Sequence, residues 1–248
     1  MPVYNGTSSN DLLFGSSSND TMYGNGGNDT IYGQGGNDYI DGGIGNDYID
    51  GGDGADDLFG GAGNDNIFGG NGNDYIDGGI GNDYIDGGTG NDYIDGGDGA
   101  DDLFGGAGND NIFGGNGSDL LIGEAGADTL SGGNDTDYLF GGADNDVLLG
   151  GAGNDFVYGG YGNDILTGGT GADAFYFGSL LEGVDVIKDF QWIEGDVIQI
   201  SKSGFTASSL SQFNYNSLTG GLSFLGQQFA TIENRPAGFA VSLDVQLI

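Results

Sequence analysis

The residues of this 248-residue sequence that could do chemistry are aspartates placed nine residues apart. A glycine stands five residues before each of them, and each is followed two residues later by a large apolar side chain. The nineteen aspartates are Asp11, Asp20, Asp29, Asp38, Asp47, Asp56, Asp65, Asp74, Asp83, Asp92, Asp101, Asp110, Asp119, Asp128, Asp137, Asp146, Asp155, Asp164 and Asp173. Oxygen donors in flexible glycine loops favour Ca²⁺, which accepts about 6 to 8 oxygens, over Mg²⁺, which demands a stricter octahedron. The sequence therefore predicts a row of calcium ligands.

The composition excludes most other chemistry. The sequence has no cysteine and no histidine, so it has no disulfide, thiolate or imidazole metal site, Ser-His-Asp triad or Cys-His dyad. Its 38 acidic and 3 basic residues argue against nucleic acid and anionic membranes as partners. No apolar run approaches the ~20 residues of a membrane span. We expect a protein that is not an enzyme, with no catalytic residues.

The aspartates belong to a nine-residue unit that reads G-G-x-G-x-D-x-U-x, where U is apolar. Glycines at the first, second and fourth positions allow positive φ and close backbone approach, as tight turns require. The x-U-x segment suits a short strand in which U points inward and its neighbours outward. One apolar residue in nine cannot form a core alone, but stacked units can line a narrow one. The unit predicts an all-β solenoid.

Charge divides the chain into two parts. Residues 1–178 contain 31 of the 38 acidic residues, 51 of the 58 glycines and no base. Stacked coils would place like charges about 4.8 Å apart, which requires a cation between them. A blander interpretation is that the aspartates only keep the solenoid soluble, but solubility does not require a nine-residue spacing.

The units from Gly6 to about 177 resemble the nonapeptide repeats of the RTX (repeats-in-toxin, or hemolysin-type calcium-binding repeat) family. The resemblance implies a right-handed parallel β-roll with two nonapeptides in each coil. It also implies Ca²⁺ between successive coils, held by aspartate carboxylates and backbone carbonyls. Nineteen units would form one row of ten aspartates and one of nine, with at most about 17 ions if each gap holds one.

Some units depart from the pattern. The units that begin at Gly6 and Gly15 lack the glycines at the second and fourth positions, so we expect weaker sites there. Asp135 and Asp144 stand at the fourth position of two later units, and aspartate tolerates left-handed geometry better than most residues. The most regular turns, and the best-ordered ions, are expected from Gly42 to Gly117. Within that stretch residues 51–72 recur as residues 96–117, an offset of five whole units.

The outward positions carry aromatic residues. At the ninth position seven of the ten odd-numbered units are aromatic, against three of the nine even-numbered units. This predicts an aromatic stripe on the sheet of the odd units. The stripe would serve self-association or contact with a cell-surface glycan, or it would only reflect β-propensity and cross-strand stacking, which is the interpretation we favour.

The nine-residue spacing ends near residue 178, which predicts two domains, a β-roll over residues 1–177 and a small β-rich cap over residues 178–248. Residues 184–190 and 196–200 alternate like strands, 206–212 could form a short helix and 213–225 reads as a hairpin. This segment resembles the C-terminal region of secreted RTX proteins, cyanobacterial ones in particular. The ending Asp244-Val245-Gln246-Leu247-Ile248 resembles an uncleaved signal for the type I secretion machinery.

These features predict a secreted, non-enzymatic calcium-binding protein at the cell surface or outside the cell, as part of a surface layer, sheath or matrix. The first repeat glycine, Gly6, leaves little room for an upstream catalytic domain, and Met1 with the serine-rich first coil resembles a natural start. Two alternatives stay open. One is the secretion and folding module of a larger RTX enzyme or toxin, and the other is a calcium-dependent self-assembling filament.

Overall fold

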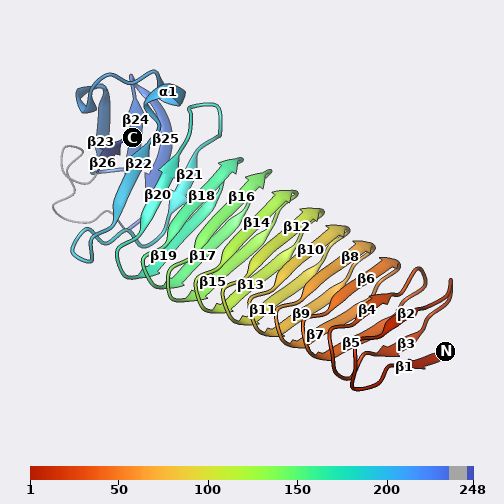
Figure 1. Ribbon diagram of the computed structural model, residues 1–248. Coiled ribbons are helices and arrows are strands. Elements are labelled where there is room, and N and C mark those ends of the chain that lie inside the picture. Colours follow the sequence, from red (N-terminus) through yellow and green to blue (C-terminus); the bar gives the residue numbers. More distant parts are fainter. Residues whose placement is uncertain (235–244) are drawn as a thin grey trace.

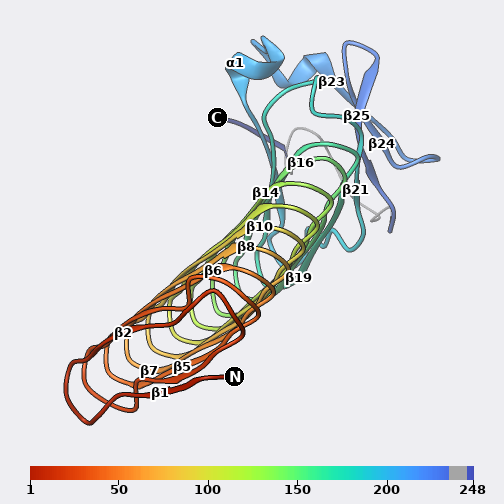
Figure 2. The same ribbon diagram turned by 90° about the vertical axis from the view of Figure 1, so that its right-hand side faces the viewer.

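A computed structural model describes residues 1–234 and 245–248. The chain winds into an elongated stack of coils, with the N-terminus at one end and the C-terminal strands at the other (Figure 1). Seen from the N-terminal end, the coils lie behind one another around a common axis (Figure 2). Each coil contributes one strand to each of two long sheets.

Within each of the two sheets the strands run parallel along the whole stack of coils. Neighbouring strands are two apart in chain order, such as β3 and β5. Among the described residues, sheet A has fourteen strands, which are β1 (Val3–Asn5), β3 (Thr21–Tyr23), β5 (Tyr39–Ile44), β7 (Asp57–Ala62), β9 (Tyr75–Ile80), β11 (Tyr93–Asp98), β13 (Asn111–Asn116), β15 (Thr129–Asn134), β17 (Val147–Ala152), β19 (Ile165–Thr170), β21 (Asp185–Ile187), β25 (Gln227–Ile232), β24 (Gly221–Phe224) and β23 (Phe213–Asn216). Over the same two ranges, sheet B has twelve, which are β2 (Leu12–Phe14), β4 (Thr30–Tyr32), β6 (Tyr48–Asp53), β8 (Asn66–Asn71), β10 (Tyr84–Thr89), β12 (Asp102–Ala107), β14 (Leu120–Ala125), β16 (Tyr138–Ala143), β18 (Phe156–Tyr161), β20 (Ala174–Phe177), β22 (Val197–Ile200) and β26 (Val245–Leu247).

The register of the ladders is set by the nine-residue unit. Within the repeats, Cα partners are eighteen residues apart, as for Ile40 with Leu58 and Ile49 with Ile67. Two units therefore make one coil, and like positions of successive coils lie on top of one another. The expected fold, an all-β parallel β-roll of about ten turns, is confirmed.

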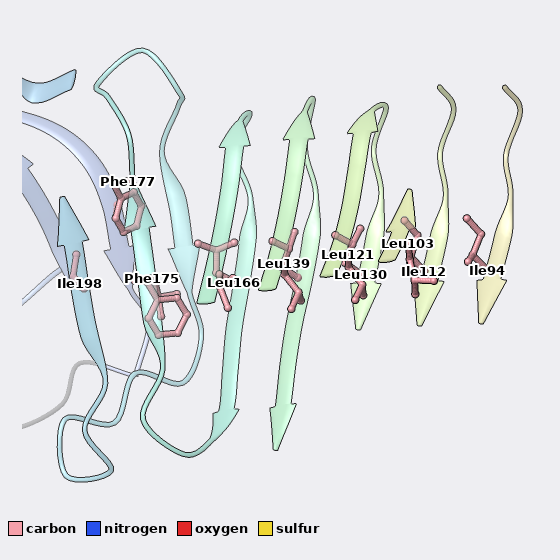
Figure 3. Close-up of a cluster of buried hydrophobic side chains, with 14 of the residues drawn as sticks. Ile94, Leu103, Ile112, Leu121, Leu130, Leu139, Leu166, Phe175, Phe177 and Ile198 are labelled. Atoms are coloured by element: carbon pink, nitrogen blue, oxygen red, sulfur yellow. The ribbon is translucent and has the colours of Figure 1, made fainter. Parts of the chain in front are cut away.

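The core is the column of U residues between the two sheets. From Met22 to Phe175 every U side chain is fully buried, and Leu13 at the N-terminal end is half-buried against this column. Figure 3 shows Ile94, Leu103, Ile112 and Leu121 pointing from the two sheets into the space between them. Burial of each such side chain contributes about 1.5–3 kcal/mol to the stability of the fold. Because each unit supplies only one of them, the column is stable only when many units stack.

The turns explain why the unit requires glycine. At Gly72 (φ +140°) an added Cβ would overlap the carbonyl oxygen of Gly54 in the preceding coil. Where another residue replaces the fourth-position glycine, as at Asp135 (φ 74°) and Asp144 (φ 78°), the backbone keeps a left-handed conformation. The expectation that aspartate would be tolerated there is confirmed.

The aromatic stripe expected on the sheet of the odd units is confirmed. Six rings line sheet B from Phe14 to Phe104, and five more, from Tyr138 to Tyr176, contact one another farther along the same sheet. A second row, which was not predicted, has six rings on sheet A from Tyr23 to Phe113. Tyrosines at the seventh position, such as Tyr39 and Tyr75, complete the row on sheet A. Neighbouring centroids within each row of six are 5.0–5.9 Å apart, so the rings contact one another, as in cross-strand stacking.

Beyond residue 177 both sheets continue. Strands β21 and β22 pair in parallel with β19 and β20, and they pair in turn with β25 and β26. The expected hairpin is present as β23 and β24, which are antiparallel. The helix expected at 206–212 is wrong in place, because α1 spans Lys202–Phe205 and a 3₁₀ turn, η1, spans Leu210–Gln212.

Phe205, at the end of α1, contacts the rings of Phe213, Phe224 and Phe229, which fill the core of this segment. Asp244 of the suggested secretion signal lies outside the described residues. In the described ranges, none of the helices has the length and apolar character needed to cross a bilayer.

Candidate metal centre

The repeat aspartates form two ladders along the edges of the roll. In each ladder the backbone N–H of one aspartate donates to Oδ1 of the aspartate one coil later, as from Asp47 to Asp65 (2.7 Å) and from Asp56 to Asp74 (2.9 Å). The odd ladder runs from Asp11 to Asp173 and the even ladder from Asp20 to Asp164. The structure therefore brings all nineteen predicted residues into two continuous rows.

The second carboxylate oxygen has a different environment. Seventeen Oδ2 atoms, one on each repeat aspartate from Asp29 to Asp173, are buried and accept no hydrogen bond from residues 1–234 or 245–248. These side chains are at most 3% exposed. A buried charged oxygen without a partner is costly, and such groups are normally paired or bound to a metal. The orphaned oxygens therefore fit a cation along each ladder.

Backbone oxygens gather at the same places. An added Cβ at Gly51 would lie 2.5 Å from Asp56 Oδ2 and 2.8 Å from the carbonyl oxygen of Gly69 in the following coil. Because the first-position glycine has no side chain, the aspartate Oδ2 and the carbonyl oxygen of the following coil face the same space. No three acidic side chains converge within the described ranges. A site here must therefore combine carboxylates with carbonyls, a donor set that suits Ca²⁺.

Burial disfavours the ionised aspartates in the absence of a cation. Desolvation, with the charges of Asp83 and Asp47, raises the pKa of Asp65 to about 7, although the N–H of Asp47 acts against this shift. The same causes raise the pKa of Asp146 to about 8, where the neighbouring charges are those of Asp164, Asp128 and Asp144. A divalent cation would reverse these shifts by stabilising the charged form.

The first coil differs as its sequence suggests. Asp11 Oδ2 accepts from the backbone N–H (2.6 Å) and hydroxyl (2.9 Å) of Thr7, and Asp20 Oδ2 accepts the same pair from Ser16. These two oxygens are already satisfied by the protein. Asp20 Oδ1 is buried without a donor, because Pro2, eighteen residues earlier, has no N–H.

The fifth-position asparagines also form ladders, beside those of the aspartates, and these were not predicted. The fifth-position asparagines accept through Oδ1 from the backbone N–H one coil later, as from Asn28 to Asn10 (2.9 Å) and from Asn46 to Asn28 (3.1 Å). Where alanine stands at this position, as at Ala55, its N–H donates to Asn37 Oδ1, but alanine has no side-chain oxygen to accept from the next coil. The high frequency of asparagine at the fifth position was the sequence signal that could have revealed these ladders. The asparagines fix the turn that carries the aspartate.

Sequence reasoning also missed two aspartates beyond the repeats. The N–H of Asp164 donates to Asp185 Oδ1 (3.1 Å), and the N–H of Asp173 donates to Asp196 Oδ1 (3.0 Å). Both aspartates occur in the pattern D-x-U-x, with Ile187 and Ile198 as U. Their separations of 21 and 23 residues, in place of eighteen, concealed them.

A search of the curated proteins found none that matches this sequence. The profile of the RTX calcium-binding nonapeptide repeat (four copies) matches eight windows, which are residues 5–40, 14–49, 23–58, 32–67, 50–85, 77–112, 113–148 and 140–175. Together these windows cover residues 5–175, more than half of the chain. With its two aspartate ladders and parallel sheets, the chain belongs to the family of RTX calcium-binding nonapeptide repeat proteins and is a calcium-binding β-roll.

Proposed function

We propose that this chain is a secreted, non-enzymatic protein that folds when it meets Ca²⁺ outside the cell and serves in a surface layer, sheath or matrix. The observation that carries the proposal is the set of seventeen buried, orphaned Oδ2 atoms, fifteen of which, from Asp29 to Asp155, lie beside a backbone carbonyl of the following coil. Without a cation the roll must bury unpaired carboxylates, so the folded state depends on metal. The repeat aspartates from Asp11 to Asp173 supply the carboxylate ligands.

The charge balance supports a large number of ions. Ten aspartates in one ladder and nine in the other leave 17 gaps between neighbours. Seventeen divalent ions would supply a charge of +34 against the chain's −35. The weakest sites lie between Asp11 and Asp29 and between Asp20 and Asp38. Thr7 and Ser16 already donate hydrogen bonds to Oδ2 of Asp11 and of Asp20 there.

The need for Ca²⁺ provides a physical reason for the proposed location outside the cell. Extracellular calcium sites have dissociation constants of about 10⁻⁴–10⁻³ M, and metal binding then supplies the free energy of folding. Where Ca²⁺ is scarce the repulsive chain stays unfolded and can be threaded through the type I secretion machinery. A role without catalysis is supported by the lack of cysteine and histidine and by the repetitive surface.

Calcium titration monitored by circular dichroism and light scattering tests the proposal. A strand signal that appears cooperatively with Ca²⁺, at constant particle size, is the expected result. A full strand signal in excess chelator at neutral pH would contradict calcium-driven folding. Growth in particle size with Ca²⁺ would favour the filament alternative, while a gene that encodes a catalytic domain beside this sequence would favour the module of a larger enzyme or toxin.

A further inference from the structure

Both aspartate ladders continue past the last nonapeptide. Asp185 and Asp196 accept the same N–H to Oδ1 bond that joins every pair of repeat aspartates, and they are 4% and 5% exposed. Each begins or directly precedes a strand, β21 or β22, that extends one of the two sheets. The chain thus forms one more coil from residues that do not follow the repeat.

On the even ladder this extra coil reproduces the repeat turn. Gly183 (φ +124°) occupies the fourth position, where an added Cβ would overlap the carbonyl oxygen of Gly162. The N–H of Val184 donates to Asn163 Oδ1 (3.1 Å) and so continues the asparagine ladder. Asp185 and Ile187 then occupy the aspartate and U positions. Three inserted residues precede this turn and leave its geometry intact.

The last repeat aspartates face these closing residues with orphaned oxygens. Asp164 and Asp173 are 0% and 1% exposed, and Oδ2 of each has no hydrogen-bond partner within the described residues. In the interior units, this atom lies beside the carbonyl of the following coil, as Asp56 Oδ2 does beside Gly69. In the last two units the three atoms nearest to an added Cβ at Gly159 and at Gly168 all belong to Asp164 and Asp173, and no carbonyl of the closing coil is among them. The coil that follows Asp164 and Asp173 is the one that carries Asp185 and Asp196.

Negative charge is concentrated at this junction. The carboxyl groups of Asp164 and Asp185 lie within hydrogen-bonding reach of each other, and Glu182 is close enough to act on both. On the odd ladder, the charges of Asp173 and Asp189 act on Asp196, whose Oδ2 accepts from the backbone N–H of Gln191 (2.6 Å). Two buried carboxylates in contact repel each other unless a cation lies between them or one of them takes up a proton.

We propose that the metal array extends into the C-terminal segment, with one divalent cation between Asp164 and Asp185 and another between Asp173 and Asp196. This inference rests on the proposed function, because the two sites take calcium only if the repeats do. The cations would fix β21 and β22 on the roll, and therefore also β25 and β26, which pair with them. Folding of the C-terminal segment would then require calcium as the repeats do.

The variants Asp185→Asn and Asp196→Asn test the inference. Asparagine keeps an Oδ1 acceptor for the ladder bond while the charge is removed. Asp196→Asn also loses the Oδ2 that accepts from the N–H of Gln191 (2.6 Å), so Asp185→Asn is the cleaner test of the two. Counting bound ions by native mass spectrometry at saturating Ca²⁺ should show one ion fewer in each variant than in the unmodified chain. The control Asp57→Asn removes an exposed charge on the outer face of β7 and should keep the full count.

Unchanged counts in both variants, with calcium bound to the unmodified chain, would overturn this inference and leave the proposed function standing. No calcium on the unmodified chain would instead overturn the proposed function. Anomalous diffraction from calcium-grown crystals of the unmodified chain provides a measurement that needs no variant. Peaks between Asp164 and Asp185 and between Asp173 and Asp196 are expected, and peaks confined to the repeats would refute both sites.

Discussion

The carboxylate of Asp74 has two unlike oxygens, one bound to Asp56 and one without a partner. Oδ1 accepts the backbone N–H of Asp56 at 2.9 Å, one coil earlier, while Oδ2 is buried and accepts nothing from the described residues. One oxygen thus holds two coils in register and the other is available to a cation. The same division recurs along both ladders.

Asp74→Asn separates these two functions. The amide oxygen can still accept from Asp56, but the charge and the free carboxylate oxygen are lost, so the chain should bind one Ca²⁺ fewer. At a calcium concentration 100-fold above the dissociation constant, losing one site removes about 2.7 kcal/mol of stabilisation. Isothermal titration and chemical unfolding in calcium measure both effects. Asp57→Asn is the control, and an equal loss in that variant would contradict a specific site.

Acid should replace calcium in part. Burial raises the pKa of Asp65 and Asp74 to about 7 from an ordinary value of 3.8, so the calcium-free folded state favours the protonated form. A raised folded-state pKa contributes stability that is present below the unfolded pKa and is lost as the pH rises through the folded value. In excess chelator, the strand signal should therefore be strongest near pH 4 and disappear between about pH 6 and 8. Circular dichroism at low protein concentration tests this, and a signal that grows with pH would contradict it.

Gly72→Ala should be severely destabilising. The new Cβ would overlap the carbonyl oxygen of Gly54, so the two coils must separate locally, in addition to the strain of a positive φ. The matched control is Gly226→Ala, where φ is also positive (90°) but no atom lies within 4 Å of the added Cβ. The control should lose about 1–2 kcal/mol from backbone strain alone. Thermal unfolding in calcium compares the two, and equal losses would show that the close approach is unimportant.

Ser16→Gly combined with Ser18→Gly should fill the calcium site between Asp20 and Asp38, which the unmodified chain occupies weakly. The pair restores the glycines at the second and fourth positions and removes the hydroxyl that donates to Asp20 Oδ2 at 2.9 Å. A turn with the regular geometry would then release this oxygen for a cation. The expected result is one additional bound ion by native mass spectrometry. An unchanged count, with the fold intact, would show that the end of the ladder limits binding.

The aromatic rows should contribute to stability and leave metal binding unchanged. Phe59 contacts Tyr39 (5.3 Å between centroids) and Tyr75 (5.8 Å), and each such pair is worth about 0.5–1.5 kcal/mol. Phe59→Leu should therefore lower the unfolding free energy by about 1–3 kcal/mol with the same ion count. Leu149→Ala changes an outward apolar residue of sheet A and should have an effect within about 0.5 kcal/mol. An unfolding free energy unchanged by Phe59→Leu would assign the rings to an external partner.

The repeats were predictable because each position meets the same environment in every coil. The inward U residues, the two sheets and the ladders of aspartates all follow from one unit and its translation. Asp185 and Asp196 were not predictable from this spacing, because three and five residues are inserted in surface turns, where chain length is weakly constrained. The second aromatic row was missed for a different reason, since tyrosine at the seventh position and phenylalanine at the ninth contact each other diagonally across strands.

The position of the short helix was set by capping that the sequence pattern did not reveal. Ser201 accepts from the N–H of Gly204 and starts α1, and Thr206 ends it in a left-handed conformation (φ 52°). The hairpin that follows was predictable because its turn residues separate two apolar segments. The local pattern therefore fixed the strands of this segment better than its helix.

The duplicated stretch has a geometric consequence. Its offset of five units is an odd number, so β7 (Asp57–Ala62) of sheet A reappears as β12 (Asp102–Ala107) of sheet B. One stretch of sequence is therefore compatible with either face, and the roll can lengthen in half-turn steps of nine residues. An odd step would leave every interior contact unchanged and yet move the distal end to the opposite side of the axis. Each added unit would therefore change both the length of the roll and the direction in which a segment attached to its distal end points.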